Sequence, residues 1–237
     1  MFVNTTYRST VPEIMDNFEM EGEILRDALD KIASINQLLG GNKVTLDGVG
    51  ILLGGQPKSA IIRIVDIGCG NGDMLRALAA FATKNQLNFE LTGIDANSFT
   101  IGHARNLSTS YPNITYKCTD IFAEPNRTEN YDIILCTLTL HHFKDEEIIN
   151  LLQTFQHSAS LGYVINDLHR SAIAYYLFKA LCFVFRLNDM SREDGLTSIL
   201  RGFKKPDLIR FSKQLNITRY IIKWKWAFRY QWIVKTS

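Results

Sequence analysis

Two patterns of hydrophobic residues follow one another along the chain: continuous apolar runs, and apolar residues at helical spacing. Residues 61–67 form an almost continuous apolar run, which is typical of a strand buried on both faces of a parallel sheet. The next segment instead carries apolar residues at helical spacing. The same succession then repeats, predicting strands at 61–67, 89–95, 114–118, 131–137 and 161–167 and helices at 72–84, 98–109, 145–157 and 171–186. Such alternation predicts an α/β fold with a doubly wound, parallel sheet.

Both ends of the chain depart from this alternation. Residues 12–39 predict one helix that stops at Gly40 and Gly41, and residues 42–60 are rich in glycine and predict an irregular segment. After a helix at 206–215, two alternating strands are predicted at 217–226 and 228–235, joined by a tight turn near Ala227. The chain is therefore expected to close with an antiparallel hairpin.

A glycine-rich bend follows the first strand, in the stretch RIVDIGCGNGDML (residues 63–75). Gly68, Gly70 and Gly72 stand at every second position, where positive φ angles and close approach of a ligand become possible. The dinucleotide fingerprint has a different spacing, G-x-G-x-x-G. Asp66 precedes the glycines, and a carboxylate there disfavours a diphosphate and favours a ligand with positive charge. The pattern therefore favours S-adenosylmethionine over NAD, and a tight turn without a ligand is the alternative.

Four motifs together resemble a known family. They are VDIGCGNGD (residues 65–73), ELTGID, which ends at Asp95, CTDIF, which contains Asp120, and YDIILCTLTLHHF (residues 131–143). From about residue 61 to the end, the sequence resembles the class I S-adenosylmethionine-dependent methyltransferases. The segments EIMD and INQLLGG in the first helix resemble the lead-in helices of small-molecule methyltransferases, some of which act on quinones and phenols.

The resemblance implies a specific architecture. It implies a Rossmann-like, doubly wound, seven-stranded and mostly parallel sheet with a C-terminal antiparallel hairpin. Residues 1–60 are expected to form an N-terminal helical extension or lid. Residues 61–237 are then expected to form the methyltransferase domain, with a helical insertion at about 170–215.

The resemblance also implies which residues bind S-adenosylmethionine. Asp66 and the glycine bend would hold the methionine end, Asp95 would accept both ribose hydroxyls, and Asp120 would face the adenine edge. The spacing of Asp95 fits NAD equally well, and Asp120 is also suited to cap a helix. The complete expected cofactor site is Asp66, Gly68, Cys69, Gly70, Asn71, Gly72, Asp95, Ala96, Asp120, Ile121, Thr137 and Leu138.

The acceptor side carries a weaker signal. The Asn/Asp-Pro-Pro-aromatic run that resembles amino-methylating enzymes is absent, and TLTLHH stands in its place. We therefore expect a small, largely apolar acceptor with a phenol- or quinol-like hydroxyl, with carbon methylation of quinone type as an alternative. A phenol benefits from a base, and the candidate catalytic residues are His142, His169 and His141. Because His141 and His142 are adjacent, we expect them to point in different directions and predict no metal site.

The predicted helix at 171–186 is rich in aromatic residues. Tyr175, Tyr176 and Phe178 are either part of an acceptor pocket or ordinary core residues, and the sequence does not decide between these interpretations.

Composition narrows the remaining possibilities. The chain has 237 residues, is 46% hydrophobic and carries a net charge of +2, which suits one globular α/β domain and does not suggest a nucleic-acid partner. The three tryptophans alternate with lysines near the C-terminus and are predicted to be core. The four cysteines are predicted to be reduced and mostly buried, in the cytoplasm. We expect no secretory signal and no membrane span. A cofactor-binding pseudoenzyme is the main alternative, and a nicotinamide-dependent oxidoreductase is disfavoured by the glycine spacing and the terminal hairpin. The sequence leaves the oligomeric state open.

Overall fold

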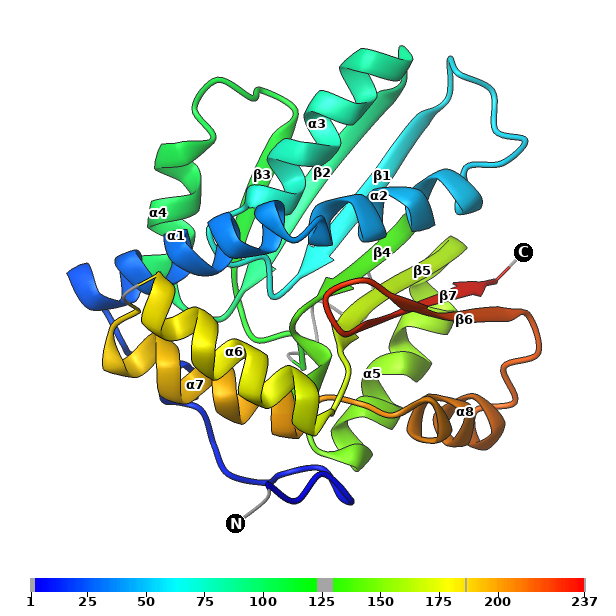
Figure 1. Cartoon of the computed structure of the whole chain (residues 1–237). Coiled ribbons are helices and arrows are strands. Elements are labelled where there is room, and N and C mark those ends of the chain that lie inside the picture. The colour runs from blue at the N-terminus through cyan, green and yellow to red at the C-terminus, as the bar shows by residue number, and fades with distance from the viewer. Residues whose placement is uncertain (1–2, 123–129, 186, 237) are drawn as a thin grey trace.

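The computed structural model describes residues 3–122, 130–185 and 187–236, and these residues form one seven-stranded sheet (Figure 1). The strand order is β3-β2-β1-β4-β5-β7-β6. The strands are β1 (Ile61–Ile67), β2 (Asn88–Asp95), β3 (Ile114–Cys118), β4 (Tyr131–Thr137), β5 (Ala159–Leu168), β6 (Tyr220–Lys225) and β7 (Arg229–Lys235).

The sheet is parallel from β3 to β5 and antiparallel at its far edge. Strand β7 pairs antiparallel with β5, and β6 pairs antiparallel with β7. Lys225 pairs with Arg229, so a three-residue loop joins the two strands, and Ala227 and Phe228 within it have φ angles of 62° and 54°. The predicted doubly wound, mostly parallel sheet with a closing hairpin is confirmed.

Helices cover both faces of the sheet. On one face, α2 (Gly41–Leu52), α3 (Asp73–Asn85) and α4 (Ser98–Leu107) contribute to one hydrophobic cluster. On the other, α5 (Asp145–Ser158) and α8 (Lys205–Gln214) contribute to a second cluster around Phe155, Phe211 and Trp232. These two clusters bury the central strands on both faces. Both faces of these strands therefore need apolar residues, which explains their continuous apolar runs.

The remaining helices gather beyond the carboxyl ends of the parallel strands, where Figure 1 shows α6 and α7 side by side. Helices α6 (Ala172–Val184) and α7 (Asp189–Arg201) come between β5 and α8 in the chain. Helix α1 (Glu23–Leu38) packs against α7 through a small cluster that includes Leu25, Leu29 and Met190. The short turns η1 (Ile14–Asp16) and η3 (Leu140–His142) lie at the same end. This arrangement encloses space above the sheet edge.

Two predictions near the N-terminus are wrong, and one helix of the expected helical insertion at about 170–215 has no predicted bounds of its own. The expected helix at 12–39 is instead η1 followed by α1, because Gly22 has a φ of 96° that a helix does not continue through. The expected irregular segment at 42–60 contains α2, in which a side chain at Gly48 would collide with Val164. Helix α7 has no counterpart among the predicted helices, because most residues that it buries, such as Ser191, are polar.

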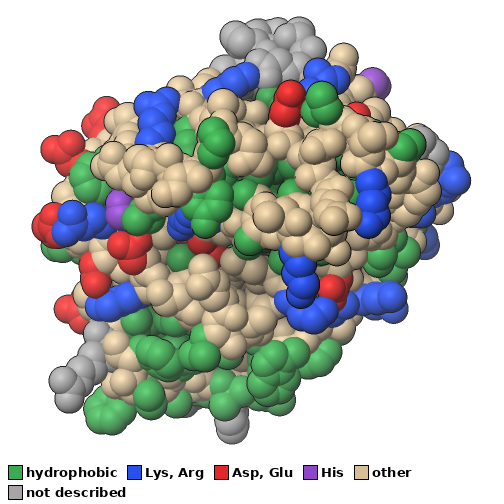
Figure 2. All heavy atoms as spheres, turned by 90° about the horizontal axis from the view of Figure 1, so that it is seen from above, with side chains coloured by type: hydrophobic (Ala, Val, Ile, Leu, Met, Phe, Trp, Pro, Cys, Tyr) green, Lys and Arg blue, Asp and Glu red, His purple; other side chains and the backbone are tan. Residues whose placement is uncertain are grey.

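The prediction that the tryptophans are core is partly wrong, whereas the prediction that the cysteines are mostly buried is confirmed. Trp232 is fully buried, but Trp224 on the edge strand β6 and Trp226 in the hairpin turn are 49% and 71% exposed. Of the cysteines, only Cys118, at the end of edge strand β3, is exposed. Figure 2 shows that hydrophobic side chains also gather on the surface along one edge of the molecule. Among the described residues, no helix has the length and apolar character to span a membrane.

Candidate functional site

A cavity of about 1370 Å³ lies at the carboxyl edge of the sheet. Its wall includes the glycine bend, one side of α1 and the facing sides of α6 and α7. Ligand pockets in proteins measure about 300–1,000 Å³, so this cavity has room for two small molecules side by side.

The glycine bend is held by backbone hydrogen bonds. The amides of Gly68 and Cys69 donate to the carbonyl oxygen of Ile94 over 2.9 and 3.1 Å. Gly68, Gly70 and Gly72 have φ angles of 67°, 52° and 76°, in the region that side chains disfavour. A Cβ on Gly72 would lie 2.1 Å from the hydroxyl oxygen of Tyr116. The backbone conformation of the bend therefore favours glycine at all three positions.

Two buried carboxylates border this bend. Asp95 accepts the amides of Gly70 and Asn97 over 3.1 and 3.0 Å, and its burial raises its pKa. Asp66 is 2% exposed, and its Oδ1 has no hydrogen-bond partner among the described residues. Burial, followed by repulsion from Asp73 and Asp95, raises the pKa of Asp66 well above its usual value. A cavity edge with an unpaired carboxylate suits a ligand that carries an ammonium group.

The other residues expected to bind the cofactor lie around the same part of the cavity. Asp120 accepts the amide of Phe122 over 2.9 Å, and the hydroxyls of Thr137 and Thr45 lie 3.1 Å apart. Gly72 does not reach the cavity wall but caps α3 behind it. The predicted residues that form the wall are Asp66, Gly68, Cys69, Gly70, Asn71, Asp95, Ala96, Asp120, Ile121, Thr137 and Leu138.

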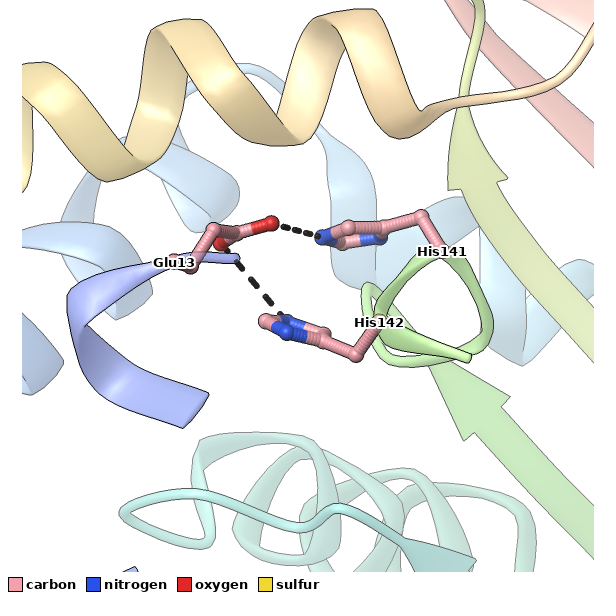
Figure 3. Close-up of side chains that lie close together, drawn as sticks. All are labelled: Glu13, His141 and His142. Atoms are coloured by element: carbon pink, nitrogen blue, oxygen red, sulfur yellow. Dashed lines mark ion pairs between the residues drawn. The ribbon is translucent and has the colours of Figure 1, made fainter. Parts of the chain in front are cut away.

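The adjacent histidines point the same way, contrary to expectation. Their ring centroids are 4.3 Å apart with an interplanar angle of 32°. After β4 the chain turns in η3 rather than continuing as a strand, in which successive side chains would alternate. The Nε2 atoms of His141 and His142 lie 3.6 and 3.8 Å from the two carboxylate oxygens of Glu13 (Figure 3). The two rings do not diverge, so the reason for predicting no metal site does not hold.

A carboxylate lies behind each histidine. Asp167 Oδ1 is 2.7 Å from Nδ1 of His141, and Asp167 Oδ2 accepts the His141 amide. Burial alone would raise the pKa of Asp167, but attraction to His141 and the hydrogen bonds that it accepts hold that pKa below its usual value. Asp16 Oδ1 is 2.6 Å from Nδ1 of His142. Because each Nδ1 is occupied in this way, each Nε2 is directed at Glu13.

Glu13 is almost completely buried. Its Oε2 accepts from the hydroxyl of Ser198 over 2.6 Å, whereas its Oε1 has no hydrogen-bond partner in the described part of the chain. Burial raises the pKa of Glu13 to about 7, against the attraction of His142 and Arg201. The Arg201 guanidinium is 2.6 Å from Asp16 and also donates to the carbonyl oxygens of His141 and His142. Arg201 therefore joins α7 to η1 and η3.

Sequence reasoning missed Glu13, Asp16, Asp167 and Arg201. Glu13 and Asp16 belong to the EIMD segment, which carries only a family resemblance in the sequence, and Asp167 lies two residues before the candidate base His169. The sequence shows only that each of these charged residues stands next to apolar residues. No spacing along the chain indicates that the four side chains meet.

Three other candidates lie outside the cavity wall. His169 packs against Phe228 and Tyr230, and its Nδ1 accepts from Nε1 of Trp224 over 3.3 Å. Burial, with help from Lys204 and Arg170, lowers the pKa of His169. Tyr176 is 42% exposed, and its hydroxyl accepts the amide of Val3. Tyr175 also lies outside the wall, whereas Phe178 lines the cavity.

Known proteins share this fold. Residues 64–160 match a family model described as a methyltransferase domain. No protein with a curated description matches the sequence significantly. Among solved structures, the plantazolicin methyltransferase BpumL in complex with SAH (S-adenosylhomocysteine) is 18% identical, with 88% of this chain and 89% of that chain covered and a TM-score of 0.66.

Two further solved structures differ more from this chain. The CurJ carbon methyltransferase is 15% identical, with 82% of this chain and 54% of that chain covered and a TM-score of 0.60. Magnesium protoporphyrin IX methyltransferase (ChlM) from Synechocystis PCC 6803, with bound SAM (S-adenosylmethionine), is 14% identical, with 94% and 89% covered and a TM-score of 0.56. At these identities the likeness establishes a common fold.

Proposed function

We propose that the chain transfers the methyl group of S-adenosylmethionine to a small, largely apolar acceptor. The methyltransferase-domain match of residues 64–160 and the fold shared with methyltransferases that bind SAH or SAM support this proposal. The methylated atom is the oxygen of a phenol- or quinol-like hydroxyl. The acceptor oxygen attacks the methyl carbon as the carbon–sulfur bond of the sulfonium breaks, and the hydroxyl gives its proton to a base that lines the cavity. The leaving thioether is neutral and needs no proton. Alignment of acceptor, methyl group and sulfur in a water-poor cavity contributes about 7–11 kcal/mol to such a reaction.

The composition of the cavity wall carries this proposal. Leu25, Leu29, Phe178 and other apolar side chains from α1 and α6 line much of it. At the end beside η3, this apolar surface is interrupted by the cluster of Glu13, His141 and His142. Within the described residues, one nitrogen and one oxygen of this cluster make no hydrogen bond. A molecule that fits both surfaces is apolar over most of its area and carries one polar group, of which a hydroxyl is the simplest.

The cofactor fits the opposite part of the same cavity. In this arrangement Asp66 faces the ammonium group of the methionine moiety, Asp95 accepts from the ribose hydroxyls, and Asp120 lies at the adenine. Thr137 and Leu138, at the end of β4, lie between the glycine bend and η3. The reactive methyl group would then face the cluster at η3, where the hydroxyl is placed.

Carbon methylation is the second candidate. The fold is shared with CurJ, which is described as a carbon methyltransferase, and a carbon acid would also use a polar group beside the methyl donor. The polar cluster by itself does not distinguish between an acidic carbon and a hydroxyl, so identification of the product separates the two candidates.

A screen of metabolite pools with S-adenosylmethionine labelled in its methyl group tests the proposal. We expect one labelled small molecule, whose O-methyl group is identified by mass spectrometry and NMR. A label on carbon would establish the second candidate instead. A label on nitrogen, or in protein or nucleic acid, would refute both. Tight binding of S-adenosylmethionine without any transfer would identify a pseudoenzyme.

A further inference from the structure

We propose that Glu13, His141 and His142 form a binding site for a divalent transition-metal cation of the zinc class. One ligand atom from each residue lies within 4.8 Å of the others. Glu13 comes from the segment before η1, and both histidines come from η3, so two distant parts of the chain converge on one point (Figure 3).

The spacing of the ligand atoms suits such an ion. Two imidazole nitrogens and one carboxylate oxygen are a donor set that zinc uses when it keeps an open coordination position. Bonds of about 2.0–2.2 Å in a tetrahedron place neighbouring ligand atoms about 3.4 Å apart. The Glu13 oxygens lie 3.6 and 3.8 Å from the two Nε2 atoms. These two contacts are made by different oxygens of Glu13, and the three ligand atoms lie within 4.8 Å of one another. A contraction of at most about 1.4 Å would therefore complete the site.

The groups behind the histidines are arranged as a metal site requires. A ligating histidine usually donates its other N–H group to a carboxylate, which sets the tautomer and the ring orientation. Here Asp167 is the hydrogen-bond partner of Nδ1 of His141, and Asp16 is the partner of Nδ1 of His142. Both Nε2 atoms are thereby left as acceptors that face the same point, and this arrangement occurs at both histidines.

Two buried atoms at that point lack a hydrogen bond among the described residues, although Glu13 Oε1 lies 3.6 Å from Nη1 of Arg201. His141 Nε2 and Glu13 Oε1 make no hydrogen bond within the described residues, and each side chain is 3% exposed. Buried polar atoms in native proteins nearly always have a partner. A cation between these two atoms would satisfy both, and its fourth ligand would come from the side of the cavity.

The surrounding charge also favours a cation. Asp194 accepts the amides of Ile14 and Met15 beside the cluster. With Glu13, Asp16 and Asp167, four carboxylates are thus present. Two guanidinium groups oppose them: that of Arg201, which pairs with Glu13 and Asp16, and that of Arg8, which donates to the carbonyl oxygen of His141.

The open position gives the ion a role, and this step rests on the proposed function. A hydroxyl oxygen of the acceptor would be a suitable fourth ligand, because a bound divalent cation makes a coordinated hydroxyl group more acidic. Metal binding itself does not depend on the acceptor and is therefore tested without it.

Titration of the chelator-treated protein with Zn²⁺ in a calorimeter and with Co²⁺ in an absorption spectrometer tests the site. We expect one equivalent of each ion to bind, and Co²⁺ to show the visible absorption of tetrahedral nitrogen and oxygen ligation. His142→Ala and Glu13→Gln should each weaken Zn²⁺ binding by at least about 10-fold, and Asp16→Asn should weaken it by about 10–100-fold. His169→Ala serves as the matched control and should bind Zn²⁺ normally.

Two further controls keep the result decisive. Cys118→Ser removes the exposed thiol and should leave binding unchanged. Circular dichroism confirms that each variant is folded. His142, whose side chain is 26% exposed, is the main test position because its loss disturbs the core less than loss of His141. Absence of one-equivalent binding, or equal binding by wild type, His142→Ala and Glu13→Gln, would overturn the site. A methyl group found on an atom other than oxygen would refute the proposed function and leave metal binding untouched.

Discussion

The two ends of the cavity are built in different ways. At one end, the amide of Gly70 joins the glycine bend to Asp95, which is 25 positions away along the chain. At the other end, the cluster around Glu13 joins side chains that are 126 positions apart, as in His142 with Asp16, or 185 apart, as in Arg201 with Asp16. The glycine-bend end is therefore a local backbone structure, and the η3 end is a network of charges that only the complete fold brings together.

This difference predicts different weaknesses. A site made by backbone amides and positive φ angles is damaged by adding an atom, because a Cβ has no room. A site made by buried charges is damaged by removing one, because the partner charge is then left without compensation. The following substitutions test this contrast, beginning with the largest expected effect.

Arg201→Met should destabilise the η3 end most. Arg201 is 7% exposed and is joined to Asp16 and to the carbonyl oxygens of η3. Breaking a buried ion pair costs about 3–5 kcal/mol, which chemical unfolding measures. Arg210→Met removes an exposed ion pair with Asp145 and should cost about 0–1 kcal/mol. Equal losses in the two variants would show that the charge network contributes no special stability.

Gly72→Ala should have the next largest effect, at the glycine-bend end. The new Cβ would meet the Tyr116 hydroxyl at 2.1 Å, and the residue has a φ of 76°. Overpacking costs about 1–3 kcal/mol, and the left-handed conformation adds about 1–2 kcal/mol. Gly102→Ala, where a Cβ has open space in α4, is the control in thermal unfolding. Equal melting temperatures would contradict a backbone-limited site.

Asp95→Ala should weaken S-adenosylmethionine binding without unfolding the protein. Loss of charge-assisted hydrogen bonds costs about 1.5–3 kcal/mol, or roughly 10- to 150-fold in Kd, as measured by calorimetry. Asp132→Ala is the matched control, because Asp132 accepts the Arg63 amide at the amino end of β1. A Kd equal to that of the wild type would remove Asp95 from the cofactor site.

His169→Ala should have the smallest effect on turnover. This imidazole contacts Trp224, Phe228 and Tyr230 rather than the cavity. His142→Ala, by contrast, should lower turnover by at least about 10-fold, with S-adenosylmethionine affinity unchanged. Rates of labelled methyl transfer measure both variants. A larger loss at His169 than at His142 would move the acceptor away from the cluster at η3.

The strands illustrate what is predictable from sequence. The predicted strands at 61–67, 114–118 and 131–137 agree with β1, β3 and β4 at both ends. Their apolar runs are continuous because the sheet is covered on both faces, and this property leaves a direct trace in the sequence. The glycine bend is equally legible, because its backbone angles demand glycine at particular positions.

The helices around the cavity are harder to predict. Helix α7 buries four polar residues, Ser191, Asp194, Ser198 and Arg201, but only two apolar ones, Met190 and Ile199. Its buried side therefore gives a weak hydrophobic pattern in the sequence. Asp194, Ser198 and Arg201 find partners in the segment around η1 and in η3, which lie between 60 and 185 positions away in the chain. Glu13 is likewise buried because it contacts Ser198 and Arg201 of α7, which are far away in the chain.

By itself, the sequence determined the parallel sheet, the glycine bend and the carboxylates that stand at the ends of the strands. Each depends on the conformation or burial of a short segment, which constrains the residues of that segment directly. Only the tertiary structure decided that His141 and His142 face the same way, that Glu13 meets them, and that His169 does not line the cavity. Those positions depend on contacts between distant side chains, which no local pattern of residues encodes.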